Sequence, residues 1–230
     1  MIGGVCSIVG RQYLIFNGNM QLKQWPWAPF ALFAVAVGLY PLVYYFTDMT
    51  HGGLLQSKPR ELLGNGWYLP LFYLHITGGG LALLIGWTQF SPRLRARYIA
   101  VHRRIGKAYV IAVGVSSSAG LCIAFFATGG LASATGFGTL AITWLFTDIM
   151  AYSSIRKLDI RRHEEWMIRN YALCFAAVTL RLYLPLSQVL HLPFITAYQV
   201  ISWLCWVPNL LIAQWIIRKG RKYASLPANY

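Results

Sequence analysis

Apolar residues are gathered in six runs along the chain, and polar and charged residues concentrate in the short segments between them. A helix needs about twenty predominantly apolar residues to cross the hydrocarbon core of a bilayer, and each run reaches that length within a few residues. Pro26 and Pro29 stand at the start of the first run, where proline fits the first turn of a helix. The pattern predicts six membrane-spanning helices, at residues 27–46, 70–90, 108–127, 135–155, 170–189 and 194–217.

Composition extends this pattern to nearly the whole chain. Hydrophobic residues make up 57% of the 230 positions and charged residues 11%, whereas a soluble domain carries about 25% charged residues. We therefore expect an all-α polytopic transmembrane bundle with an N-terminal cytoplasmic segment at 1–26, a single six-span domain at 27–217 and a basic cytoplasmic tail at 218–230. The N-terminal residues lack the basic region and cleavage site of a signal peptide, which leaves the natural start open between Met1 and Met20.

The net charge of +14 comes from short basic clusters that alternate along the chain. The loops after the second and fourth runs and the C-terminal tail are basic, whereas 128–134 and 190–193 carry no Lys or Arg and 47–66 carries only Lys58 and Arg60. Because Lys and Arg concentrate in cytoplasmic loops, the alternation predicts that both termini are cytoplasmic, in the cell inner (cytoplasmic) membrane. Such clusters suit anionic lipid headgroups at the inner loops and do not indicate nucleic acid as a partner.

Aromatic residues cluster near the ends of the predicted spans. Trp67, Tyr68, Tyr98, Trp166 and Tyr171 are examples. Tyr and Trp are enriched at the level of the lipid headgroups, so we expect these side chains to form an interfacial belt.

Several classes of site are not indicated by any motif. The sequence contains no P-loop, no dinucleotide-binding GxGxxG, no HExxH and no GxSxG. The four cysteines are scattered without a CxxC pair, which argues against a structural zinc site or a disulfide framework.

His75 lies inside the second predicted span, below its outer boundary. On a helix, Gly78 shares its face, and Ala82 and Gly86 continue the row at intervals of four. One interpretation makes His75 a ligand beside a flat surface where a planar cofactor could lie. The other makes the row a small-residue packing seam, in which His75 bonds to a neighbouring helix. We favour packing for Gly78, Ala82 and Gly86 and leave both roles open for His75.

Two charged residues lie within the other spans, where each needs a partner. Arg181 falls at a similar outer depth to His75, so it either snorkels outward or joins His75 in a pocket for an anionic ligand. Asp148 falls in the inner half of the fourth span. It is either one half of a buried ion pair, with Arg169 or another inner base, or a proton-relay carboxylate.

The inner loops hold the richest group of candidates. His163, Trp166 and Arg169 recur at intervals of three, which places them on one helical face. Asp159 is a suitable N-cap for that helix. His102 precedes the third span by nearly the distance that separates His163 from the fifth, so the two histidines lie at equal depth. They are either ligands of a shared haem or metal, or ordinary histidines in the headgroup layer.

Four segments carry a family resemblance: LHITGGGLALLIGWTQF, HRRIGKAY, the GF-containing fourth span and RRHEEWMIRNYALCFAAVTLRLYLPL. Together they resemble a bacterial multi-pass membrane family known only as domain of unknown function 2306, over about residues 70–187. The resemblance implies membrane location and a four-helix core made of the second to fifth spans, with no established reaction. That core is similar in outline to cytochrome b561-like and ferric-reductase-like bundles, although here only His75 lies within the apolar core.

Two classes of function therefore remain open. The first is a haem- or quinone-binding protein of electron transport, with haem b as the leading cofactor. The second is a non-redox small transporter, a lipid-binding protein or an accessory subunit, either as a homo-oligomer or in a larger membrane complex. A transporter would be expected to show an inverted repeat or a Pro-broken pair of half-helices, and we find neither in the sequence.

Overall fold

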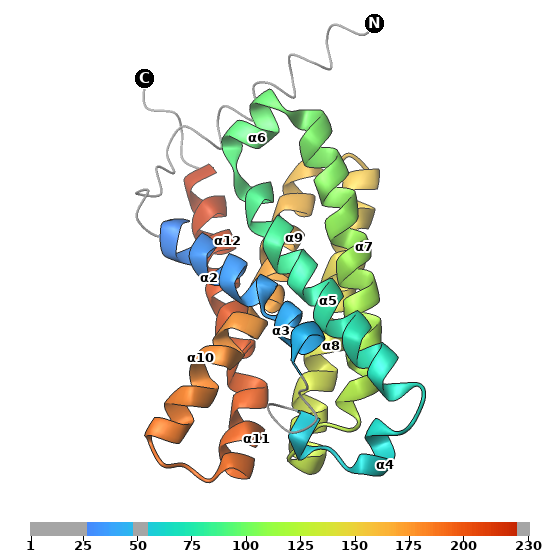
Figure 1. Ribbon diagram of the computed structural model, residues 1–230. Helices are drawn as coiled ribbons and strands as arrows, with labels where there is room; N and C mark the ends of the chain where they lie inside the picture. The colour runs from blue at the N-terminus through green and yellow to red at the C-terminus, as the bar shows by residue number, and fades with distance from the viewer. Residues whose placement is uncertain (1–26, 48–54, 225–230) are drawn as a thin grey trace, which may run out of the picture.

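The computed structural model describes residues 27–47 and 55–224, and these ranges are helical with no strand among them (Figure 1). This confirms the expected all-α class. The helices are α2 Trp27–Leu39, α3 Pro41–Phe46, α4 Arg60–Leu63, α5 Tyr68–Gly86, α6 Pro92–Arg97, α7 Ile99–Ala124, α8 Gly130–Arg156, α9 Ile160–Cys174, α10 Ala176–Val189, α11 Phe194–Leu204 and α12 Val207–Ala224, with short 3-10 turns at Leu55–Ser57 and Trp87–Phe90.

Five helical segments are long and apolar enough to cross a membrane. They are Ala28–Phe46, Tyr68–Phe90, Ile99–Ala124, Ile160–Val189 and Phe194–Arg221. The predicted run 135–155 also forms a helix, α8, which at 1.5 Å per residue is about 40 Å long. Asp148 and a series of Ser and Thr residues make α8 less apolar than the other five, and it is not among these segments.

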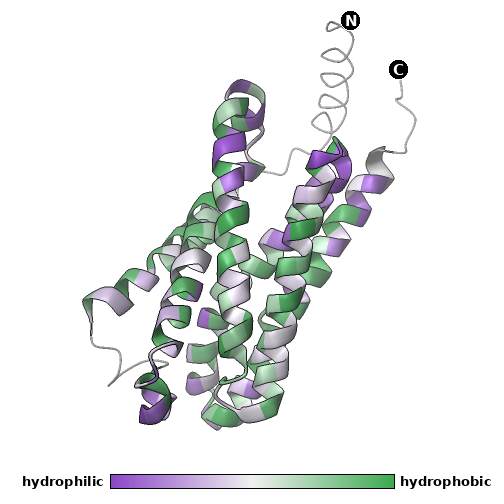
Figure 2. Cartoon of the chain, turned by 90° about the vertical axis from the view of Figure 1, so that its right-hand side faces the viewer, coloured by the Kyte–Doolittle hydropathy of each residue, from purple (hydrophilic) through white to green (hydrophobic). Residues whose placement is uncertain are grey.

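The core is a four-helix arrangement made by α5, α7, α8 and α9. Helix α5 packs on α7, α7 on α8, α8 on α9, and α9 returns to α5, so α7 and α9 stand at opposite corners. The remaining long helices lie outside this group: α2 packs on α5 and α10, α11 on α8, and α12 on α9. Figure 2 shows the hydrophilic segments at the two ends and apolar residues along most of the helix length between them.

Two core helices begin earlier than the hydrophobic pattern predicts. Helix α7 begins at Ile99 and α9 at Ile160, whereas the predicted spans begin at 108 and 170. The apolar spans mark where the chain enters the hydrocarbon, and the basic turns before them are helical too, as the Asp159 cap predicted for α9. The side chain of Asp159 caps α9 as expected, accepting a hydrogen bond from the Arg162 amide at 3.1 Å. His102 lies in the first turns of α7 and His163 in the first turn of α9.

The segments Ile160–Val189 and Phe194–Arg221 are each interrupted, which the sequence did not suggest. Phe175 separates α9 from α10, and Cys205-Trp206 separates α11 from α12. One side chain, Asn209, links both interruptions: its Nδ2 lies 3.3 Å from the Ala172 carbonyl, 3.0 Å from the Cys205 carbonyl and 2.9 Å from the Thr179 hydroxyl. Both segments still coincide with the predicted spans 170–189 and 194–217.

Close helix contacts explain the small-residue row on α5. A Cβ added at Gly78 would lie 2.9 Å from the Ala112 carbonyl oxygen of α7. A Cβ at Gly86 would collide with the rings of Tyr109 and Tyr171. Ala82 is fully buried. The row therefore lies inside the chain's own core, where it packs α5 against α7 and α9.

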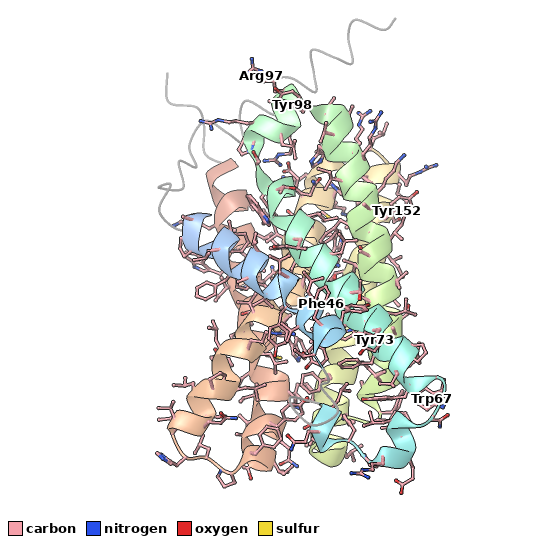
Figure 3. All side chains as sticks on the ribbon, viewed as in Figure 1. Phe46, Trp67, Tyr73, Arg97, Tyr98 and Tyr152 are labelled. Carbon is pink, nitrogen blue, oxygen red and sulfur yellow. The ribbon has the colours of Figure 1, made fainter. Side chains whose placement is uncertain are left out.

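The aromatic side chains divide into two groups. Figure 3 shows Tyr98 and Arg97 at the α6 end of the molecule and Trp67 at the opposite end. Trp67 and Tyr98 are exposed, as an interfacial belt requires. Tyr68 and Tyr171 are buried, so the prediction that they belong to the belt was wrong. Tyr171 donates a hydrogen bond to the Leu83 carbonyl at 3.1 Å and is a core residue.

Candidate functional site

One hydrogen bond across the core sets the register of α7 against α9. The Tyr109 hydroxyl donates to Asn170 Oδ1 at 2.6 Å, and both residues are fully buried. His102 precedes Tyr109 by seven positions, and His163 precedes Asn170 by seven positions. Seven residues are close to two turns, or about 10 Å along a helix. His102 and His163 therefore lie on the facing sides of α7 and α9, two turns nearer the α6 end.

The two rings differ in how their nitrogens are used. His163 Nδ1 lies 2.9 Å from the carbonyl oxygen of Ala151 on α8. An Nδ1–H held by a carbonyl leaves Nε2 as the free acceptor. His102 Nδ1 is buried and has no hydrogen-bond partner. The charge of His163 acts on His102, and the charge of Arg95 acts on both rings. A buried ring nitrogen without a partner is costly, and it is the kind of atom that a ligand satisfies.

Ion pairs surround this end of the bundle. Arg95 on α6 binds Glu164 on α9 at 2.7 Å. Glu165 binds Arg221 on α12, through Nε at 2.6 Å, and lies 3.7 Å from Arg161 in its own helix. These pairs attach α6 and α12 to the start of α9. They hold the helix that carries His163 in place.

Trp166 and Arg169 lie together on α9, as the three-residue spacing predicts. The Arg169 guanidinium lies 4.6 Å from the centre of the Trp166 ring. Its Nε and Nη2 donate to Gln214 Oε1 of α12, at 3.1 and 3.0 Å. Arg169 is thus engaged with α12.

Asp148 lies beside the polar network that joins the core helices. Asn170 Nδ2 donates to the Trp144 carbonyl and to Thr147 Oγ1, each at 3.0 Å. The next residue, Asp148, is buried at 3% exposure, and its Oδ1 has no hydrogen-bond partner. Arg169, the base we named first as its partner, binds Gln214 instead. Asp148 makes no ion pair with any residue in the part of the chain that the structure describes.

His75 is held by α7. Its Nδ1 lies 2.9 Å from the Ser116 carbonyl oxygen, while the Ser116 hydroxyl donates to the His75 carbonyl at 2.8 Å. The ring also packs on Gly120, where an added Cβ would lie 2.6 Å from Nδ1. These contacts are those of a residue that packs two helices together. Arg181 is near enough for its charge to act on His75, and no direct contact joins the two side chains among the described residues.

Arg181 lies between α10 and α2. One guanidinium nitrogen, Nη1, donates to the carbonyl of Ala177 in its own helix at 3.0 Å. The guanidinium lies 4.5 Å from the centre of the Tyr40 ring. Its Nε is buried without a partner.

The loop at the opposite end contains a lysine that the sequence analysis gave no role. Lys58 donates a hydrogen bond to the carbonyl of Phe126, and burial lowers the pKa of its amine to about 8. Within residues 27–47 and 55–224, no group of three or more His, Cys, Asp and Glu side chains is placed to hold a metal ion.

These features define a multi-pass helical membrane protein with a polar core at one end. Residues 72–217 match the family described as "Predicted membrane protein (DUF2306)", and the chain belongs to that family. This confirms the resemblance found in the sequence. The match extends beyond residue 187 and includes α11 and most of α12, so the family's shared region is larger than the four helices expected.

A curated relative adds a second comparison. The chain is 24% identical over 138 residues to "Ava biosynthesis cluster protein G" of Aspergillus versicolor, which covers 47% of this chain and 41% of that protein. The chain thus spans less than half the length of this relative. No solved structure matches the chain.

Proposed function

We propose that this protein is a haem-binding redox protein of the membrane, in which His102 and His163 would hold one haem b. The observation that carries the proposal is the placement of the two histidines on facing sides of α7 and α9, at the same level. Helices at opposite corners of a four-helix core can supply ligands to both faces of one planar group.

The state of each ring fits this role. A ligating histidine usually donates its other ring N–H to a carbonyl or carboxylate, as His163 does to Ala151. His102 has a buried ring nitrogen, Nδ1, that has no hydrogen-bond partner in the structure and could therefore bind a ligand. Arg103 is near enough to His102 to supply the positive charge that a haem propionate needs, whereas Arg95 is paired with Glu164. A bound haem supplies one-electron chemistry, and the protein's part is to orient it and tune its potential.

The outer histidine does not fit a second haem. His75 Nδ1 lies against the Ser116 carbonyl, and the ring packs closely on Gly120. The other described histidines, His102, His163 and His191, belong to the helix ends. The proposal is therefore for a single haem.

The arrangement in the membrane is part of the proposal. We propose that α8 is a sixth crossing, because it runs beside α7 and α9 and is about 40 Å long. The basic residues of α6, the first turns of α7 and α9 and the end of α12 then face the cytoplasm, together with both termini and the haem site. The membrane is taken to be the cell inner membrane, with anionic headgroups at the basic face.

The visible spectrum of the purified protein tests the haem. After expression with excess haem precursor, the protein in mild detergent should show a Soret band and a sharp α-band on reduction. H102A and H163A should each lose the reduced α-band of a two-histidine haem. H191A changes an exposed histidine and is the matched control; it should keep both bands, as should H75A. The absence of a Soret band, or bands unchanged in H102A and H163A, would refute the proposal.

The paired interruptions favour a second candidate, a small transporter. Discontinuous membrane helices that meet near the midplane are typical of transporters, and α9–α10 and α11–α12 are interrupted side by side at Asn209. Spin labels at Val189 and Leu39, both exposed, would report the distance from α10 to α2 in lipid nanodiscs. Two distance populations are expected of a transporter. A single narrow distance would count against it and leave the haem proposal untouched.

A further inference from the structure

Arg181 is a cation in the apolar part of the molecule, and no acidic side chain within residues 27–47 and 55–224 forms an ion pair with it. The acidic side chains within residues 27–47 and 55–224 are Glu61 near the outer end and Asp148, Asp159, Glu164 and Glu165 on α8, on α9 or between them. None of them pairs with Arg181. Burying a charge in a membrane protein is costly unless an opposite charge or several hydrogen bonds compensate it.

The hydrogen bonds of Arg181 compensate little of this cost. A guanidinium carries five N–H donors. The structure gives Arg181 one hydrogen bond, to the Ala177 carbonyl, which also belongs to the Ala177–Arg181 turn of α10. Its Nε is buried without any partner. An anion with two or more oxygen atoms can accept hydrogen bonds from the unused N–H donors and also balance the positive charge.

The side chain is held back from the membrane surface. A snorkelling arginine extends its guanidinium into headgroup water. Here the guanidinium lies against the face of Tyr40, at 4.5 Å from the ring centre. Arg181 precedes the end of α10 at Val189 by eight residues, which is about 12 Å along the helix. Snorkelling therefore does not explain this position.

The stacked pair of Arg181 and Tyr40 lies at the edge of the surface that faces lipid. Tyr40 is 37% exposed, and Leu39 beside it on α2 is 45% exposed. On α10, Leu182 and Leu186 are also exposed, at 48% and 51%. An amphiphile in the bilayer could therefore reach Arg181 from the side while its chains stay against leucines.

We propose that Arg181 binds the anionic head of a membrane amphiphile, a phosphodiester or a carboxylate, where α10 packs on α2. The guanidinium supplies charge and paired N–H donors, and the Tyr40 ring forms a flat wall that fixes its plane. The exposed leucines of α2 and α10 hold the chain. The site is separate from the proposed haem site, which lies toward the α6 end, and it does not depend on it.

Lipid retention in native mass spectrometry tests the site. The purified protein is mixed with phosphatidylglycerol or with phosphatidylcholine, and the bound lipid is counted. The wild type should retain phosphatidylglycerol in preference to phosphatidylcholine. R181Q should bind it about tenfold more weakly, since it loses charge-assisted hydrogen bonds. R60Q removes an exposed arginine of α4, which serves as the matched control, and should bind as the wild type does.

Competition distinguishes the sources of the anion. Oleate should displace phosphatidylglycerol from the wild type if the site takes any anionic amphiphile. Displacement by inorganic phosphate at equal concentration would show a site for a small anion and would overturn the amphiphile. Equal retention of phosphatidylglycerol by R181Q and wild type would overturn the site itself.

Two further variants test the same site in case R181Q does not fold. R181K keeps the charge and loses the paired donors, and Y40L removes the aromatic wall. Both should weaken retention while the protein stays monodisperse. If either variant folds and retains phosphatidylglycerol as the wild type does, the assigned role of that group is wrong.

Discussion

The bond between Tyr109 and Asn170 fixes the register of α7 and α9, and its removal gives a direct test of the core. Y109F deletes one hydroxyl and no carbon, so the packing of a fully buried ring is kept. The donor is lost, and Asn170 Oδ1 is left buried without it. Hydrogen bonds between membrane helices are worth about 0.6 kcal/mol on average and up to about 1.7 kcal/mol.

The structure supports a value near the upper end. The donor–acceptor distance is 2.6 Å, both residues are inaccessible, and water has no direct access to replace the hydroxyl. An acceptor left unsatisfied costs about 1–3 kcal/mol. We therefore expect Y109F to lower the free energy of unfolding by about 1.5 kcal/mol. N170A should cost more, because it also removes the bonds to Trp144 and Thr147.

Unfolding by sodium dodecyl sulfate in mixed micelles measures both variants. Y152F is the matched control, because Tyr152 is an exposed tyrosine of α8 with no hydrogen bond given by the structure (Figure 3). It should leave stability unchanged. The double variant Y109F/N170A should cost less than the sum of the two single variants, since they share one bond. A Y109F protein as stable as wild type, or costs that simply add, would refute the assigned register.

Three further predictions concern other parts of the molecule. The Lys58 amine loses its proton as pH rises through about 8, so the rate of Lys58 acylation should be half-maximal near pH 8. Peptide mapping measures this rate, and a rate that does not change between pH 7 and pH 9 would contradict the burial of the amine. G120A should lower the free energy of unfolding by about 1–3 kcal/mol, because its Cβ meets His75; a stable G120A would contradict the close packing. N209L should raise hydrogen exchange around the two interruptions, and unchanged exchange would show that Asn209 does not hold them.

The helical fold was predictable because membrane-spanning segments need length and apolarity, which are local properties. Five of the six predicted runs coincide with helices that are apolar enough to cross. The interruption at Phe175 was not predictable in this way, since the break contains neither Gly nor Pro. It is compensated by Asn209, a residue more than thirty positions later, and no local pattern reports such a partner.

The candidate residues show the same limit. Equal depth of His102 and His163 followed from the sequence, but their facing positions depend on the Tyr109–Asn170 bond, which joins residues distant in the chain. The two seven-residue spacings were visible in the sequence, and they gain meaning only once that bond is known. For Asp148 the charge pattern suggested Arg169, which instead binds Gln214 of the last helix. Competition among long-range partners decides such contacts.

The hydrogen bonds that Asn209 makes to Ala172, Thr179 and Cys205 have a consequence for the biogenesis of the protein. Helix α10 has 14 residues and α11 has 11, so each is shorter than the about 20 residues that cross a bilayer alone. Each therefore needs its adjoining half-helix to enter the membrane. The carbonyl of Ala172, which Asn209 satisfies, is synthesised before Asn209 leaves the ribosome. The last two crossings thus reach their final hydrogen bonding together, and a nascent chain halted before Asn209 would expose an uncompensated break to the insertion machinery.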